Sequence, residues 1–286
     1  YGCLGFIHRR EGQWQFKRLG TLQALQQLHH HFDALVVGSP YMVQQTRDHG
    51  LPEHKVHLMP LYYQRPSLSS PVQTTPTIPT APFRLLFVGQ LLQGKGLDIL
   101  FRALHTLKTS AQCPDFRLDI LGRGSQEQKL KDLVHQLGLQ NQVHFAGWVE
   151  DKSAYWQAAQ ALVLPSRTPE TFGLVGLEAM AHGIPVIASD VGGIRTWLTH
   201  GYNGDLFPSG DVRALANCLR NALHNPKQSH KKGQQGYALW QRSFQPQHHI
   251  QPLIRLLEQL EPIKTINLHA PNSMISERTP HYVPHC

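Results

Sequence analysis

Two glutamates, Glu170 and Glu178, stand eight positions apart in the stretch PSRTPETFGLVGLEAMAHGIPVIASDVGG, residues 165–193. On a single helix, eight residues at about 3.6 per turn would leave them about 80° apart, a poor arrangement for shared chemistry. Pro169 instead keeps the preceding loop extended, so we expect Glu170 in the loop and Glu178 in a helix that begins near Phe172. The two carboxylates would then lie at different places along one ligand.

The start of this predicted helix is suited to an anion. The amides of Gly173, Leu174 and Val175 lack intrahelical partners and carry roughly half a positive charge, which favours a diphosphate. Glu178 lies about 7 Å along the helix axis, close to the separation between a pyrophosphate and the far edge of its ribose. Glu170 lies on the other side, at the group that the phosphates carry. Each carboxylate would accept hydrogen bonds from hydroxyls at one end of the ligand.

Each glutamate also has a simpler, structural explanation. Glu170 could merely favour the dipole at the helix start, and Glu178 could pair with a neighbouring base. We favour ligand binding because both acids occur together with the segments PS, FGL, EAMA, G-x-PV and GG.

Two further loops follow predicted strands. In FVGQLLQGKG, residues 87–96, Gly89 lets the backbone approach a ligand and Lys95 presents an ammonium group, although an ordinary loop with a solvated lysine would look the same. In LGRGSQEQKL, Gly122 begins a dinucleotide-like pattern, but Glu127 stands at the third glycine position. We therefore do not expect a Rossmann dehydrogenase.

These loops depend on an alternation of strands and helices. Apolar, β-branched strands separated by helical stretches predict a parallel sheet covered on both faces, with the ligand beyond the carboxyl ends of the strands. The expected strands are 83–89, 116–122, 143–147, 161–166 and 185–189, and the expected helices are 95–107, 125–137, 151–159, 172–182, 211–224 and 247–260, with basic, Gln-rich helical sequence up to residue 242.

The flanking sequence differs from this central part. Residues 19–31 have a helical period, and 32–39 and 55–61 are typical of strands on either side of a helix at 40–49. Five prolines between residues 65 and 82 indicate an interdomain linker. The last twenty or so residues lack periodicity and are expected to form a loose tail.

Composition narrows the ligand and the compartment. Among 286 residues, 27 Lys and Arg against 19 Asp and Glu give a formal charge of +8, which favours anionic ligands. No dense Lys/Arg helix indicates nucleic acid binding, and the four cysteines lack the spacing of a zinc site or a disulfide framework. No apolar run reaches about 18 residues, the length that spans a membrane. We expect a protein of the reducing cytoplasm, and one that is part of a longer chain because neither Met nor a leader begins it.

One basic and aromatic segment offers another class of function. HRREGQWQFKR, residues 8–18, could meet anionic headgroups at the inner membrane surface, although we favour an exposed loop. The run of histidines at 29–31 and the final HYVPHC do not lead us to expect a metal site.

The stretch 165–193 resembles the signature of the family-4, or group 1, retaining glycosyltransferases. The segments FVGQLLQGKGLDIL, LDILGRG and VHFAGWV extend this resemblance over residues 83–224. It implies an α/β protein of the GT-B fold, with a complete Rossmann-like C-terminal nucleotide-sugar-binding domain and the partial end of an N-terminal Rossmann-like domain. The implied division is 1–64 for the partial N-terminal, acceptor-side domain, 65–82 for the linker, 83–245 for the C-terminal domain, and 246–286 for a crossover helix and tail.

The resemblance also implies roles for individual residues. Lys95 would bind the diphosphate of the donor, Glu170 would hold hydroxyls of the transferred sugar, and Glu178 would hold the ribose. Trp148 and Val149 would border the base. The implied catalytic residues are Lys95 and Glu170, and the implied donor-binding residues are Gly89, Gln90, Gly122, Trp148, Val149, Phe172, Gly173, Leu174, Val175 and Glu178.

Three features depart from the family pattern. The usual arginine after FVG is Gln90, so Lys95 must act without a second cation or another base must replace it. Thr196 stands where a glutamate is common. The start of the N-terminal domain, with its glycine-rich donor loop and sugar-facing histidine, is absent from the sequence, and no histidine here is given that role.

The predicted activity is transfer of a sugar, of the hexosyl type, from a nucleoside diphosphate sugar to a hydroxyl of a sugar, a lipid-linked sugar or a small molecule, with retention at the anomeric carbon. No cofactor is expected, and the lack of a D-x-D triplet argues against an obligatory divalent metal. The alternative from another class is a non-catalytic nucleotide-sugar-binding remnant, which the missing N-terminal half would explain.

Overall fold

The computed structural model describes residues 5–10, 13–18, 32–65, 82–110 and 113–260. The helical pattern expected at 19–31, nearly all of the expected linker and the expected tail lie outside the described residues.

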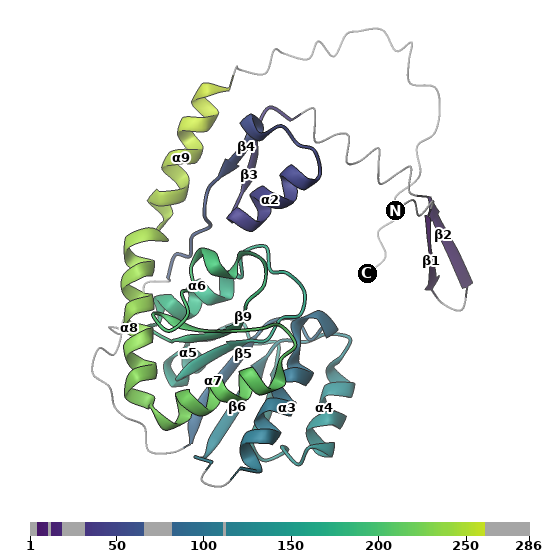
Figure 1. The fold of residues 1–286 in the computed structure, drawn as a ribbon, viewed down its shortest axis with the longest axis vertical. Helices are drawn as coiled ribbons and strands as arrows, with labels where there is room; N and C mark the ends of the chain where they lie inside the picture. Colours follow the sequence, from purple (N-terminus) through teal and green to yellow (C-terminus); the bar gives the residue numbers. More distant parts are fainter. Residues whose placement is uncertain (1–4, 11–12, 19–31, 66–81, 111–112, 261–286) are drawn as a thin grey trace.

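A parallel sheet of six strands forms the centre of the protein (Figure 1). Its order is β10-β9-β8-β5-β6-β7, and every neighbouring pair is parallel. Both faces are covered, so the strands are apolar along most of their length. The strands are β5 (Phe83–Val88), β6 (Phe116–Leu121), β7 (Val143–Gly147), β8 (Ala161–Leu164), β9 (Val186–Ser189) and β10 (Gly204–Phe207).

Successive side chains of these strands enter two separate cores. Leu85 and Phe87 pack with the helices of one face, which are α3 (Leu97–Lys108), α4 (Glu127–Gln136) and α7 (Val212–His224). Leu86 packs with those of the other, which are α5 (Ser153–Ala158), α6 (Leu174–Ala181) and α8 (Pro226–Ser243). The expected Rossmann-like layering is therefore confirmed. Neither β10 nor the 3-10 helix η4 (Gly192–Thr196) was expected, because both are short and lie among glycines.

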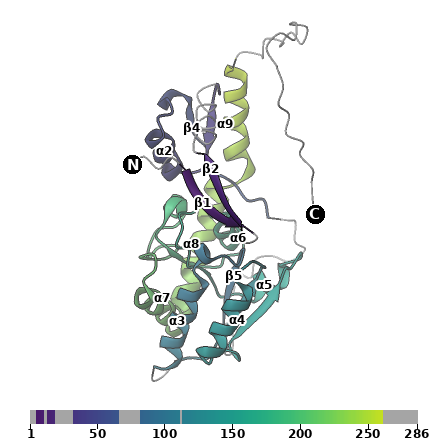
Figure 2. The ribbon, with the colours of Figure 1, turned by 90° about the vertical axis from the view of Figure 1, so that its right-hand side faces the viewer.

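A second, smaller group of elements lies beyond the α6 end of this domain in both views (Figure 1 and Figure 2). It is a parallel β-α-β unit, made of β3 (Leu35–Val37), α2 (Pro40–Asp48) and β4 (Val56–Leu58), as the sequence predicted. The last helix, α9 (Pro246–Gln259), returns to it: the ring nitrogen Nδ1 of His249 is 3.0 Å from the carbonyl oxygen of Pro60. The chain thus crosses back toward its N-terminal part, as the resemblance implied.

The basic segment near the N-terminus forms an antiparallel hairpin of β1 (Gly5–Arg10) and β2 (Gln13–Arg18). The expectation of a loop is wrong here. In the sequence, Glu11 and Gly12 separate two six-residue stretches, and a two-residue connection that ends in glycine is a hairpin signal.

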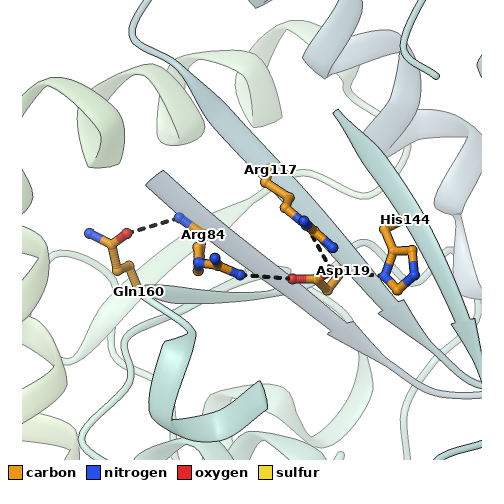
Figure 3. A network of polar contacts seen from close by, with 5 residues as sticks. All are labelled: Arg84, Arg117, Asp119, His144 and Gln160. Atoms are coloured by element: carbon orange, nitrogen blue, oxygen red, sulfur yellow. Dashed lines mark hydrogen bonds and ion pairs between the residues drawn. The ribbon is translucent and has the colours of Figure 1, made fainter. Parts of the chain in front are cut away.

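A polar network lies on the sheet surface away from the carboxyl ends of the strands (Figure 3). The Asp119 side chain is 7% exposed and accepts hydrogen bonds from Arg117 Nε at 3.1 Å and His144 Nδ1 at 3.0 Å. Arg84 lies further off, with an ion-pair distance of 3.8 Å, and its amide donates to Gln160. These contacts satisfy a buried carboxylate on β6, so we assign the network to structure rather than to the site.

Candidate functional site

The candidate site lies where the order of the strands reverses. From β5 the chain builds β6 and β7 on one side and then returns to build β8, β9 and β10 on the other. The loops after β5 and β8 therefore leave neighbouring strands in opposite directions, which is where open α/β sheets bind ligands. Lys95 lies in the first loop and Glu170 in the second.

The structure brings these two predicted residues into contact. Lys95 Nζ is 2.7 Å from Glu170 Oε1, although 75 positions separate them. The same carboxylate oxygen accepts a hydrogen bond from Ser166 Oγ at 2.5 Å. Ser166 is buried, and its contact with Glu170 was not predicted even though PS was noted as part of the motif. The lysine and glutamate side chains are 31% and 18% exposed, so a ligand can reach the pair.

Glycine at two positions lets the loops approach so closely. Gly96 has φ of +68°, and a Cβ there would lie 1.9 Å from the carbonyl oxygen of Pro165. A Cβ on Gly122 would lie 1.9 Å from the carbonyl oxygen of Gly89. The amides of both Gly89 and Gly122 already donate within the sheet edge, to Leu121 and Gly147. Gly89 and Gly122, both predicted to bind the donor, therefore shape this edge of the sheet, and their amides are already hydrogen-bonded to other strands.

Helix α6 begins at Leu174, slightly later than the earliest predicted start. Gly173 is its N-cap in the left-handed conformation, with φ of 81°. The amides of Gly173, Leu174 and Val175 are then the first donors of the helix, which have no intrahelical acceptor. Leu174 is an exposed side chain at this end. These amides therefore lie at the start of the helix, as the sequence predicted, and anion binding there stays a prediction.

Phe172, one of the predicted donor-binding residues, packs into the core. Its side chain is 1% exposed and meets Phe244 edge to face, with ring centroids 6.3 Å apart. Its carbonyl accepts a hydrogen bond from Trp197 Nε1 at 2.7 Å. The ring therefore belongs to the core beneath the loop, where it supports the start of α6.

Glu178 also has a lysine partner. Lys152, the residue before α5, places Nζ 2.8 Å from Glu178 Oε2, with exposed fractions of 31% and 17%. Burial raises the pKa of the nearby Tyr63 hydroxyl, and the Glu178 charge raises it further. Both glutamates are thus ion-paired, which the structural explanation expected only for Glu178. Neither pair is closed off from solvent, which leaves both carboxylates accessible to hydroxyl groups.

The remaining predicted residues lie on loops at the same edge. Trp148 follows β7 and is 74% exposed, whereas Val149 is partly buried against the core on the α6 side. Gln90 is exposed after β5. Two arginines on these loops were not singled out: Arg123 is exposed, and Arg167 forms an ion pair with Asp98.

A histidine at the far end of α6 packs against an indole. His182 caps the helix, stacks on Trp156 with ring centroids 5.4 Å apart, and lies 2.8 Å from the carbonyl oxygen of Glu178 through Nδ1. Burial lowers the pKa of the imidazole from its ordinary value of 6.5, and the charges of Arg65 and Lys152 lower it further, against the opposing effect of Glu178.

This lowered pKa predicts an acid-sensitive contribution to stability. The unfolded chain binds more protons at this residue below about pH 6.5, so the contribution is complete above that pH and is lost as the pH falls toward the folded pKa. Between pH 7.5 and 5.5, we expect the melting temperature of the wild-type protein to fall more than that of His182→Gln. Equal losses in thermal unfolding experiments on the two proteins would contradict this.

The described residues hold neither a candidate metal cluster nor a candidate membrane-spanning helix. Within the described ranges, no cluster of three or more His, Cys, Asp or Glu side chains is placed to hold a metal ion. In the same part of the chain, no helix is long and apolar enough to cross a membrane.

A family model and curated relatives identify the family of this chain. The model of the family "Glycosyl transferases group 1" matches residues 73–239. An uncharacterised glycosyltransferase of Haemophilus influenzae is 33% identical over 50% of this chain and 40% of its own length, and the phosphatidyl-myo-inositol mannosyltransferase of Mycobacterium leprae is 38% identical over 49% and 37%. The chain thus spans less than half the length of these curated relatives.

Solved structures agree in fold. HepE of Anabaena, crystallised with UDP and glucose, has a TM-score of 0.71 at 23% identity, over 85% of this chain and 68% of that chain. Sucrose-phosphate synthase of Thermosynechococcus elongatus also has a TM-score of 0.71, at 27% identity over 85% and 62%. These likenesses confirm the GT-B type of fold. Together with the family match, they mean that the chain belongs to the group 1 glycosyl transferases.

Proposed function

We propose that the protein transfers a hexosyl group from a nucleoside diphosphate sugar to an acceptor hydroxyl, with retention at the anomeric carbon. The observation that carries the proposal is the partly exposed Lys95–Glu170 pair at the strand-order reversal, whose glutamate lies on the loop that leads into the first turn of α6. A cation and helix amides suit a departing diphosphate, and a carboxylate suits the hydroxyls of the sugar that it leaves.

In this mechanism the protein acts mainly by electrostatics. Positive charge builds on the sugar ring as the diphosphate departs, and Lys95 and the amides of Gly173 and Leu174 stabilise the negative charge on the leaving group. Donor hydroxyls replace part of the Lys95 contact with Glu170, which frees the ammonium for phosphate. The leaving phosphate takes the proton of the acceptor hydroxyl. The protein needs no further cofactor or divalent metal for these steps.

Because Gln90 stands where the family pattern has an arginine, another residue must supply the second positive charge. Arg123 is exposed on the loop after β6, whose backbone is joined to the β5 loop by the bond from the Leu91 amide to the Arg123 carbonyl at 2.9 Å. We assign its guanidinium group as the second cation that, with Lys95, binds the diphosphate of the donor. Trp148, an exposed aromatic ring beyond β7, is the surface on which the nucleotide base would lie.

The relatives support a sugar nucleotide as donor. The Anabaena protein was crystallised with UDP and glucose, and the Mycobacterium leprae relative is named for mannosyl transfer to a lipid. We also propose a cytoplasmic location, where a lipid-linked acceptor would bring the protein to the inner membrane surface. The non-catalytic alternative is not favoured, since both predicted catalytic residues are present and in contact.

A thermal-shift panel on the full-length protein tests the donor class. UDP-glucose, GDP-mannose and ADP-glucose are compared with their free sugars, since a ligand that binds the folded state raises the melting temperature. We expect a rise with one of the sugar nucleotides and none with a free sugar. No rise with any of the three would contradict the proposal.

Removing Glu178 should weaken donor binding more than turnover. In Glu178→Ala the ribose loses its carboxylate acceptor, so we expect the donor Kd to rise about tenfold, the effect of one charged hydrogen bond, with kcat little changed. Calorimetry and steady-state kinetics measure the two effects. Glu127→Ala removes a glutamate that pairs with Lys131 on α4 and should leave Kd unchanged. A wild-type Kd in Glu178→Ala would remove this residue from the site.

A further inference from the structure

The loop that joins Glu170 to α6 is held through three successive carbonyl groups. Glu170 O accepts from the amide of Gly193 at 2.7 Å, and Phe172 O accepts from Trp197 Nε1 at 2.7 Å. Both of these donors come from η4 and the residue after it. The middle carbonyl, that of Thr171, accepts from Ser39 Oγ at 2.6 Å, and this donor lies 132 positions away in the β3-α2-β4 unit.

Ser39 fits this position with no spare room. It is fully buried, its hydroxyl accepts from the Met42 amide at 3.3 Å as the N-cap of α2, and its proton goes to the Thr171 carbonyl. On the other side, a Cβ on Gly193 would lie 2.7 Å from Ser39 Oγ and 2.3 Å from the Thr171 oxygen. The start of α2, the Glu170 loop and η4 therefore meet at one point.

We propose that Ser39 is a positioning residue of the transfer reaction, which holds the Glu170 loop from the β3-α2-β4 unit. This rests on the proposed function. A fixed Thr171 carbonyl fixes the peptide next to Glu170, and so fixes the direction of its carboxylate relative to the first amides of α6. Ser39 thereby acts on the sugar end of the donor and not on its nucleotide end.

The test separates these two ends of the donor. The probes are the sugar nucleotide that gives the largest thermal shift among UDP-glucose, GDP-mannose and ADP-glucose, and its own nucleoside diphosphate. In the full-length protein, Ser39→Gly removes the hydroxyl, and glycine is itself a favoured N-cap residue. Asp211→Ala is the control, because Asp211 caps α7 in the same way through the Ala214 amide, at 2.9 Å.

By calorimetry, Ser39→Gly should bind the nucleoside diphosphate with the wild-type Kd. Its preference for the sugar-bearing donor, which is the ratio of the two Kd values, should be smaller by about fivefold, the value of one hydrogen bond. Its kcat should fall about tenfold or more, since misplacement of a catalytic group slows the chemical step. Asp211→Ala should lose stability and keep both the preference and kcat. An unchanged preference in Ser39→Gly, or an equal loss in Asp211→Ala, would overturn this inference alone. Absence of donor binding by wild-type protein would instead overturn the proposed function.

Discussion

Lys95→Ala should lower kcat by about 10² or more, the usual effect of deleting one preorganised group that stabilises charge in the transition state. The lysine is the predicted principal cation for the diphosphate, because Gln90 stands at the usual arginine position and Arg123 supplements it only from the loop after β6. The loss should appear mainly in kcat, because the developing charge of the leaving diphosphate exceeds that of the bound donor. Steady-state kinetics with the full-length protein and its donor measure this.

Lys131→Ala provides the matched control for Lys95→Ala. Lys131 also forms a 2.7 Å ion pair with a glutamate and is similarly exposed, but it lies on the surface of α4. It should retain wild-type kcat. A Lys95→Ala protein that keeps its turnover would mean that the Lys95–Glu170 pair serves only to join two loops.

Glu170→Ala should also lower kcat by about 10² or more, because the transferred sugar loses the carboxylate that orients it for attack. Removing Glu170 releases Lys95 for the phosphates, so binding of the bare nucleoside diphosphate should not weaken. This combination distinguishes a role at the sugar from a role at the nucleotide. Turnover assays and calorimetry with the nucleoside diphosphate measure the two quantities.

Glu170→Gln and Glu127→Ala complete the Glu170 experiment. The glutamine keeps the size and hydrogen-bonding ability of the side chain but removes the charge, and it should retain part of the lost activity. Glu127→Ala should behave as wild type. If both Lys95→Ala and Glu170→Ala turn over donor at the wild-type rate, the assignment of the catalytic pair is refuted.

The sheet was predictable because its local signals are strong. Runs such as FRLLFV and ALVL are apolar on both faces, and this fixes a buried parallel strand without knowledge of its neighbours. Strand β10 was missed because GDLF is short and shares its first residue with GYNG, which is typical of a turn. The hairpin in residues 5–18 was also missed. Its basic and aromatic residues favoured a loop or a membrane-surface segment over two paired strands.

The site was predictable in part. Lys95 and Glu170 could be assigned to one place because parallel strands bring their following loops to one edge of the sheet. Their direct contact, and that of Glu178 with Lys152, depend on side-chain geometry between loops far apart in sequence. The packing of Phe172 could not be predicted, because a motif position does not say which way a side chain points, and here the ring points into the core.

A crystal structure of the full-length protein with its sugar nucleotide tests the central assignment most directly. We predict that the diphosphate lies against the first amides of α6, within reach of Lys95, with Glu170 on the sugar and Glu178 on the ribose. A nucleotide bound elsewhere, with both lysine–glutamate pairs still intact, would contradict it.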